Sequence, residues 1–204
     1  MTIYIIISLI AYFIGSISFS VIFSRKFAGF DVRDKGSGNA GTTNVLRSVG
    51  KKAAAITLVC DILKGVVAIG VAAIASKICK EANVEILKYL AGFFAILGHT
   101  FPIFFEFRGG KGVATALGVL ITLNWKIGLI CLIFALILIA LTRMVSVGSI
   151  LSAILFPILM IFMGHARFSS IIISLFIALL VIFNHRTNIK RLKNGTENKL
   201  SFKK

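Results

Sequence analysis

Long apolar segments separated by short polar stretches dominate this chain. The segments long enough to form membrane helices are Ile3–Phe23, Ala53–Ser76, Ile86–Phe105, Ile127–Leu141, Val145–Met163 and Ile171–Phe183. A membrane-spanning helix needs about 20 predominantly apolar residues. The pattern therefore predicts an all-α, polytopic integral membrane protein, with a single membrane-embedded domain over residues 1–204.

The number of spans depends on Val113–Leu123, an apolar segment that ends at Asn124. Either Val113–Leu141 is one long tilted helix, giving six spans, or two short helices turn at Asn124, giving seven. If the basic loop Ser24–Lys52 is cytoplasmic, six spans would place the tail His185–Lys204, with its seven Lys and Arg residues, outside. Because cytoplasmic loops carry the excess of Lys and Arg, we predict seven spans. The fourth and fifth are short, the N-terminus lies outside and the C-terminus is cytoplasmic.

Composition agrees with a membrane protein, since 58% of the residues are hydrophobic and only 15% are charged. The net charge of +16 lies in loops that flank the apolar segments. Such placement favours membrane lipids with anionic head groups over nucleic acid as partners. The three cysteines have no metal-ligand spacing, so we expect neither a metal site nor another cofactor.

The first polar loop contains the run Gly36-Ser-Gly-Asn-Ala-Gly-Thr-Thr-Asn-Val-Leu-Arg47. Hydroxyls and amides among glycines can form a nest of donors, and an arginine can bind a phosphate through two parallel hydrogen bonds. The candidate residues are Ser37, Gly38, Asn39, Thr43, Asn44 and Arg47. An ordinary flexible turn remains an equal alternative for this loop taken alone.

A second polar loop reads Phe107-Arg-Gly-Gly-Lys-Gly-Val-Ala-Thr115 and precedes an apolar helix. Arg108 and Lys111 supply charge, and Gly109, Gly110 and Gly112 allow backbone N–H groups to approach an anion. The first turn of the following helix adds further N–H groups. The loop lacks the spacing of an ATP-binding P-loop, so it predicts a phosphate pocket without ATP hydrolysis. A tight turn anchored to lipid head groups is the alternative.

The tail begins His185-Arg-Thr-Asn-Ile-Lys-Arg-Leu-Lys-Asn-Gly-Thr-Glu197. On a helix, His185 and Asn188 share one face where the last span leaves the membrane. Most of the lysines fit a segment that binds anionic lipid, whereas His185 and Asn188 are candidates for chemistry.

Asp61 and Lys64 are charged residues within an apolar segment, three positions apart. Charges inside a membrane are costly and face the protein interior or water. They form either a structural ion pair or a support for the substrate site. His99, which precedes the glycine loop, fits helix-end packing better than catalysis.

These motifs, in this order, resemble the bacterial acyl-phosphate:glycerol-3-phosphate acyltransferases (PlsY). The matching stretches are Gly36 to Arg47, Asp61-Ile-Leu-Lys-Gly65, Gly98-His-Thr-Phe-Pro102 with Gly109 to Thr115, and His185 to Glu197. Ser18 stands where the family usually has proline, and Thr42 where alanine is usual. Neither position carries a proposed catalytic group.

The resemblance implies transfer of a fatty acyl group from acyl phosphate to the 1-hydroxyl of sn-glycerol 3-phosphate, an early step of phospholipid synthesis at the bacterial plasma membrane. It implies a site that faces the cytoplasm. The residues that match the family's active site are Ser37, Arg47, Lys111, His185 and Asn188. Gly109, Gly110 and Gly112 match its glycerol 3-phosphate loop, and Ser149 matches a further site position.

Acyl phosphate is a mixed anhydride with a good leaving group, so direct transfer needs no covalent acyl-enzyme. His185 or the acceptor's phosphate would take the hydroxyl proton. Acyltransferases that use acyl-CoA or acyl-carrier protein carry His-x-x-x-x-Asp. The residues five positions after the histidines here are Phe104, Ser170 and Lys190. A transporter of an organic phosphate is the alternative from another class, but the chain has no internal repeat typical of transporters.

Overall fold

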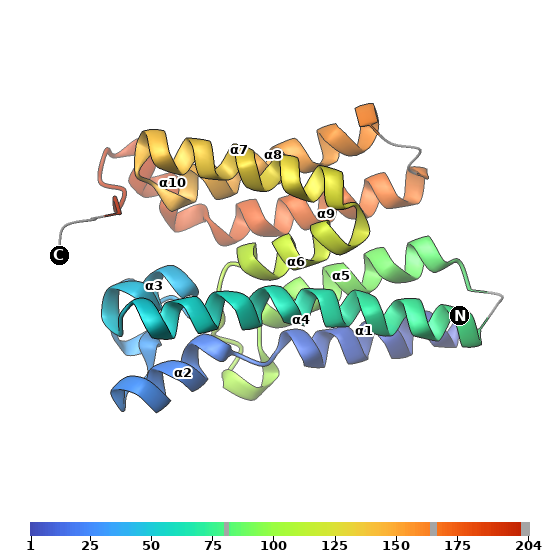
Figure 1. Ribbon diagram of the computed structural model, residues 1–204, viewed down its shortest axis with the longest axis horizontal. Helices are drawn as coiled ribbons and strands as arrows, with labels where there is room; N and C mark the ends of the chain where they lie inside the picture. Colours follow the sequence, from blue (N-terminus) through green and yellow to red (C-terminus); the bar gives the residue numbers. More distant parts are fainter. Residues whose placement is uncertain (80–81, 164–166, 201–204) are drawn as a thin grey trace. The chain divides into compact units, whose positions relative to one another are not determined.

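The structure, a computed structural model, describes residues 1–79, 82–163 and 167–200 (Figure 1). These residues form α-helices and two short 3₁₀ helices, without a strand among them, which confirms the predicted all-α class. Lys203 and Lys204, counted above in the basic tail, lie outside the described residues. The chain divides into two compact units, Met1–Leu123 and Asn124–Lys204, which are described separately. The single-domain organisation stays a prediction.

The first unit is a helical bundle with its polar loops at the helix ends. Its elements are α1 (Thr2–Gly15), α2 (Phe19–Ala28), η1 (Val32–Asp34), α3 (Thr42–Ser48), α4 (Lys51–Ile78), α5 (Val84–Thr100), η2 (Ile103–Phe105) and α6 (Val113–Leu123). Helix α5 packs against α1 and α4, and α4 also packs against α6. Along the chain, the first polar loop and α3 lie between α2 and α4, and the glycine loop lies between α5 and α6.

Small residues let these helices approach closely. A Cβ atom on Gly15 of α1 would collide with the backbone of Ala95 in α5, and one on Gly118 of α6 would collide with the backbone of Ile62 in α4. Close backbone contact of this kind is how membrane helices pack where apolar burial gives little driving force.

The first apolar segment is not one continuous helix. Helix α1 ends at Gly15, and α2 begins at Phe19 after Ser18, whose backbone is not helical (φ −91°, ψ 88°). The segment Ile3–Phe23 contains no proline, and the run Gly15-Ser-Ile-Ser18 did not lead us to predict this interruption.

The second unit contains α7 (Trp125–Thr142), α8 (Val145–Met163), α9 (Phe168–Asn184) and α10 (Arg186–Lys193). Helix α8 packs against both α7 and α9. The side chain of Asn124 caps α7, because its Oδ1 accepts a hydrogen bond of 3.2 Å from the backbone N–H of Ile127. The chain therefore does form two helices at this point, although α7, with 18 residues, is longer than predicted.

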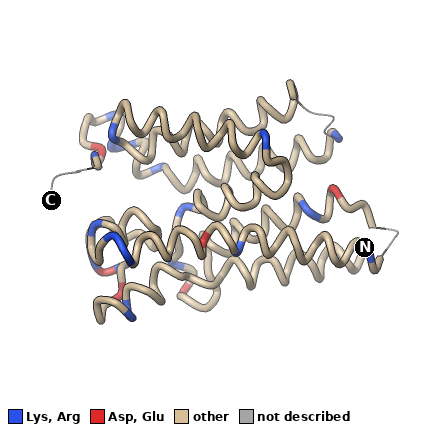
Figure 2. The backbone as a smooth tube through the Cα atoms, viewed as in Figure 1, with Lys and Arg blue, Asp and Glu red and all other residues tan. Residues whose placement is uncertain are grey.

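Five segments among the described residues are long and apolar enough to cross a membrane: Thr2–Ala28, Lys51–Ile78, Val84–Phe105, Trp125–Thr142 and Val145–Met163. The pair Phe168–Asn184 and Arg186–Lys193, bent by 58°, would be a sixth, and Val113–Leu123 is a shorter apolar helix. In the first unit, Lys and Arg gather around α2, α3 and the start of α4 (Figure 2). The protein is thus a polytopic membrane protein, while the seven-span count and the orientation stay predictions.

Candidate active site

The first polar loop is folded around the side chain of Asn44, which is buried in the first turns of α3. Its Nδ2 lies 2.9 to 3.1 Å from the carbonyl oxygens of Val32, Lys35 and Asn39. Its Oδ1 accepts a 3.0 Å hydrogen bond from the backbone N–H of Ser37. The predicted ligand Asn44 thus directs its amide into the loop, where it fixes the backbone that carries Ser37.

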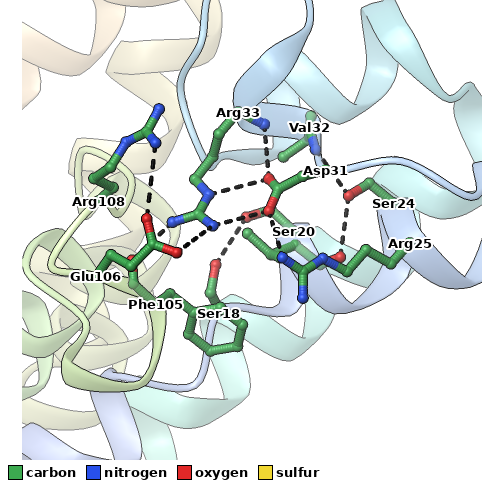
Figure 3. Close-up of polar contacts among 11 residues, drawn as sticks. Ser18, Ser20, Ser24, Arg25, Asp31, Val32, Arg33, Phe105, Glu106 and Arg108 are labelled. Atoms are coloured by element: carbon green, nitrogen blue, oxygen red, sulfur yellow. Dashed lines mark hydrogen bonds and ion pairs between the residues drawn. The ribbon is translucent and has the colours of Figure 1, made fainter.

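A clasp formed by Asp31 and Arg33 ties this loop to the glycine-loop region (Figure 3). The Arg33 guanidinium donates to both carboxylate oxygens of Asp31, at 3.1 and 2.9 Å, and to the carbonyl oxygen of Phe105 at 2.7 Å. Arg25 donates a further bond of 2.9 Å to Asp31. Because Arg33 is buried, its planar fork holds η1 and η2 in one fixed geometry.

The charge state of Asp31 follows from these contacts. Burial by itself would raise the pKa of this carboxyl group. The hydrogen bonds from Arg33 and Arg25 outweigh burial and lower the pKa from 3.8 to about 2. Asp31 is therefore ionised at neutral pH, and the clasp is a charge-assisted pair.

The glycine loop packs directly on the end of α5. The N–H groups of Gly109 and Gly110 donate to the carbonyl oxygens of Thr100 and His99, at 3.2 and 3.1 Å. A Cβ atom on Gly110 would collide with the His99 ring and would lie 2.6 Å from the carbonyl oxygen of Ala40. We expected these N–H groups to face an anion. Here the two glycines serve close packing, and the first turn of α6 retains N–H groups without helical acceptors.

Gly110 is also the point where the two polar loops meet, because Ala40 belongs to the first loop. The turn before it is strained, since Glu106 and Phe107 have left-handed backbones with φ of 58° and 57°. A carboxylate oxygen of Glu106 lies 3.9 Å from Arg108, and the other lies 3.9 Å from Arg33. The clasp and the loop contact together hold this strained turn.

The predicted residues of the first unit lie on these two joined loops. Ser37, Gly38, Arg47 and Arg108 are exposed, and Asn39, Thr43, Gly109 and Lys111 are half-buried. Gly112 is buried and has a φ of 82°, which favours glycine. Among the described residues, Arg47 has no hydrogen-bond or ion-pair partner, so its guanidinium is available to a ligand.

In the second unit, His185 lies at the bend between α9 and α10, rather than inside one continuous helix. Its Nδ1 is 2.7 Å from the carbonyl oxygen of Val181, one turn earlier. Asn188 follows in the first turn of α10, and both side chains are buried. The last turn of α9 therefore sets the orientation of the imidazole.

Glu197 accepts hydrogen bonds from several side chains of the second unit, Asn188 among them. Its Oε1 accepts hydrogen bonds from Asn188 at 2.7 Å and from Ser146 at 2.9 Å, and its Oε2 accepts one of 3.0 Å from Arg191. Burial would raise the pKa of Glu197, but these hydrogen bonds outweigh it and lower the pKa. Ser149 lies three residues after Ser146 on α8 and bonds to the carbonyl oxygen of Val145.

The sequence and structure of the chain match known proteins along almost its full length. A family profile described as glycerol-3-phosphate acyltransferase matches residues 5–195. The chain belongs to the glycerol-3-phosphate acyltransferase family. It is 45% identical to the glycerol-3-phosphate acyltransferase of Clostridioides difficile (strain 630), covering 98% of this chain and 97% of that one. It is 44% identical to the enzyme of Thermoanaerobacter sp. (strain X514), covering 96% and 95%.

Two solved structures share the fold. The crystal structure of PlsY (YgiH), an integral membrane glycerol 3-phosphate acyltransferase, in its glycerol 3-phosphate form superposes with a TM-score of 0.87. It is 35% identical and covers 97% of this chain and 96% of that one. The lysophosphatidic acid form gives a TM-score of 0.84 at 33% identity. These matches confirm the resemblance inferred from the motifs.

Sequence reasoning about this acyltransferase did not single out Asp31, Arg33 or Glu197. Asp31 and Arg33 lie just before the recognised motif, and an acid two residues from an arginine is a common surface pattern. Glu197 stood at the end of the quoted tail motif as its only acidic residue. An isolated acid in a run of basic and amide residues is the signal that could have identified it.

Proposed function

We propose that this acyltransferase uses acyl phosphate as its donor and transfers the fatty acyl group to the 1-hydroxyl of sn-glycerol 3-phosphate. The products are 1-acylglycerol 3-phosphate and inorganic phosphate. The observation that carries the proposal is the junction of two cation-bearing polar loops, through Ala40 and Gly110 and through Arg33 and Phe105, at the end of a membrane helix bundle. Such a junction offers positive charge to phosphate groups beside lipid.

The transfer is a direct displacement. The acceptor hydroxyl oxygen attacks the acyl carbonyl carbon, an ester C–O bond forms, and the bond from that carbon to the phosphate oxygen breaks. The electron pair of the broken bond leaves with the phosphate. Negative charge develops on the carbonyl oxygen and on the leaving group, so positioned cations and N–H donors lower the barrier. Arg47, Lys111 and the N–H groups of the first turn of α6 suit that role.

We assign substrate binding and positioning to the remaining predicted residues. In the first loop these are Ser37, Gly38, Asn39, Thr43 and Asn44, with Asn44 acting through the backbone it holds. Arg108, Gly109, Gly110 and Gly112 form the acceptor-phosphate loop, in which Gly109 and Gly110 provide close packing. His185 or the acceptor's own phosphate takes the hydroxyl proton, Asn188 is a further catalytic residue, and Ser149 contacts substrate.

Family membership by itself does not identify the acyl donor, but the sequence favours acyl phosphate over a thioester. The positions five after the histidines hold no aspartate, so the His-x-x-x-x-Asp motif of thioester-dependent acyltransferases is absent from the sequence. The basic loops favour a cytoplasmic site at the bacterial plasma membrane, with seven spans and an external N-terminus.

The test is release of inorganic phosphate from palmitoyl phosphate by purified protein, with and without glycerol 3-phosphate. Palmitoyl-CoA and palmitoyl-acyl-carrier protein serve as matched donors, and formation of 1-palmitoylglycerol 3-phosphate is followed in parallel. We expect acceptor-dependent turnover with acyl phosphate only. Turnover with a thioester and none with acyl phosphate would overturn the donor assignment.

A further inference from the structure

Three ionisable side chains form a buried cluster inside the first unit. The ammonium group of Lys64 lies 2.9 Å from Oδ1 of Asp61, one turn earlier on α4. Nδ1 of His99, in the last turn of α5, lies 3.6 Å from the same oxygen. All three residues are less than a tenth exposed. The carboxylate thus stands between two helices, with the ammonium group of Lys64 on one side and the imidazole of His99 on the other.

Lys64 also connects the cluster to the break between α1 and α2. Its ammonium group donates a 2.9 Å hydrogen bond to the carbonyl oxygen of Ile17, which lies in that break. A carbonyl group at membrane depth needs an internal donor, because lipid supplies none. Lys64 therefore cannot leave the ion pair without exposing both a carboxylate and a carbonyl oxygen.

His99 connects the cluster to the glycine loop. Its ring has Asp61 on its Nδ1 side and Gly110 on its Nε2 side, where even a methyl group would not fit. Its backbone oxygen accepts the N–H of Gly110, and the neighbouring Thr100 accepts the N–H of Gly109. The loop that precedes α6 therefore packs on the His99 ring and bonds to the backbones of His99 and Thr100.

We propose that Asp61, Lys64 and His99 are positioning residues that fix the glycine loop and so set the affinity for the phosphate of glycerol 3-phosphate. The inference rests on the proposed function, in which this loop binds the acceptor. The path runs from the break at Ile17 through Lys64 and Asp61 to the His99 ring and then to Gly110. A structural ion pair alone would not require the imidazole to lie against Gly110.

The experiment compares His99→Ala, which removes the ring, with His99→Asn, whose amide can take the place of Nδ1 beside Asp61. Thr57→Ala is the matched control, because Thr57 is buried on α4 one turn before Asp61 and, among the described residues, its hydroxyl bonds only to the carbonyl oxygen of Ala53 on the same helix. Hydrogen–deuterium exchange is measured for peptides that contain Gly109 and Gly110 and for peptides of α10. Steady-state kinetics with palmitoyl phosphate give KM for each substrate.

In His99→Ala we expect exchange at Gly109 and Gly110 to rise about tenfold, and KM for glycerol 3-phosphate to rise by a similar factor. KM for palmitoyl phosphate and exchange in α10 should change by less than about twofold, the level expected for Thr57→Ala. His99→Asn should recover part of both losses. Recovery by this variant also separates positioning from a simple failure to fold.

Unchanged loop exchange in both His99 variants would overturn the inference. Equal rises in the loop and in α10, with no selective change in KM, would overturn it too, because they describe general destabilisation. A rise in loop exchange with an unchanged KM for glycerol 3-phosphate would show that the loop is not the acceptor site, and the inference would fail with that assignment. Wild-type protein without acceptor-dependent phosphate release would instead refute the proposed function.

Discussion

The contribution of the clasp between Asp31 and Arg33 to folding stability can be worked out from the structure. Lowering the pKa of Asp31 from 3.8 to about 2 is worth about 2 kcal/mol of folding free energy at neutral pH. Arg33→Lys keeps the charge but cannot reproduce the two parallel bonds to Asp31 together with the bond to Phe105. We therefore expect this substitution to lower the free energy of unfolding by about 2 to 3 kcal/mol.

The direction of the pKa shift also predicts how the stability changes with pH. The pKa of Asp31 is lower in the folded protein, so the folded state is stabilised above the unfolded pKa of about 4 and loses this contribution as the pH falls toward 2. Wild-type protein should thus lose about 2 kcal/mol of stability between pH 6 and pH 2, and Arg33→Lys should lose less. The assay is unfolding followed by circular dichroism in detergent across this pH range.

Arg25→Lys is the matched control, because Arg25 donates one bond to the same carboxylate from a side chain that is 58% exposed. An exposed ion pair contributes less than about 1 kcal/mol, so this variant should stay close to wild type. The reasoning would be refuted if both arginine variants were equally stable, or if Arg33→Lys kept the full pH dependence of the wild type.

Other predictions concern the remaining polar clusters. Asn44→Ala should reduce activity at least about tenfold, because it releases the first loop. Asn44→Asp should reduce activity further, because its carboxylate would face three carbonyl oxygens. Limited proteolysis of the loop should show the same order of the two variants. Glu197→Gln should lower the free energy of unfolding by about 2 kcal/mol. In either orientation of the new amide, its NH₂ group would face another hydrogen-bond donor, on Asn188 or on Arg191. Thermal stability equal to that of the wild type would contradict this. His185→Ala should lower kcat sharply, because it removes the imidazole that would take the hydroxyl proton. A steady-state turnover assay tests this, and wild-type turnover would leave the acceptor's phosphate as the base.

Local patterns predicted well what depends on neighbouring residues. The apolar runs identified the membrane helices, and the polar Asn124 marked the end of α6 and the cap of α7. The spacing of Asp61 and Lys64 predicted a shared helix face, and the structure shows their ion pair. The glycine-rich and amide-rich motifs predicted the family, because their residue types and order are rare outside it.

Tertiary structure alone decided which polar groups from distant parts of the chain meet. Arg33 and Phe105 are separated by 72 positions, and Ser146 and Glu197 by 51, so no local spacing could pair them. The roles of Asn44, Gly109 and Gly110 also depended on the tertiary structure, since an amide or a backbone N–H group can face either a ligand or the protein. The sequence thus determined a membrane-embedded acyltransferase and the loops that serve it, because hydropathy and motif order are properties of neighbouring residues. Folding decided which side chains bind substrate and which hold the loops in place, because that choice depends on contacts between distant segments.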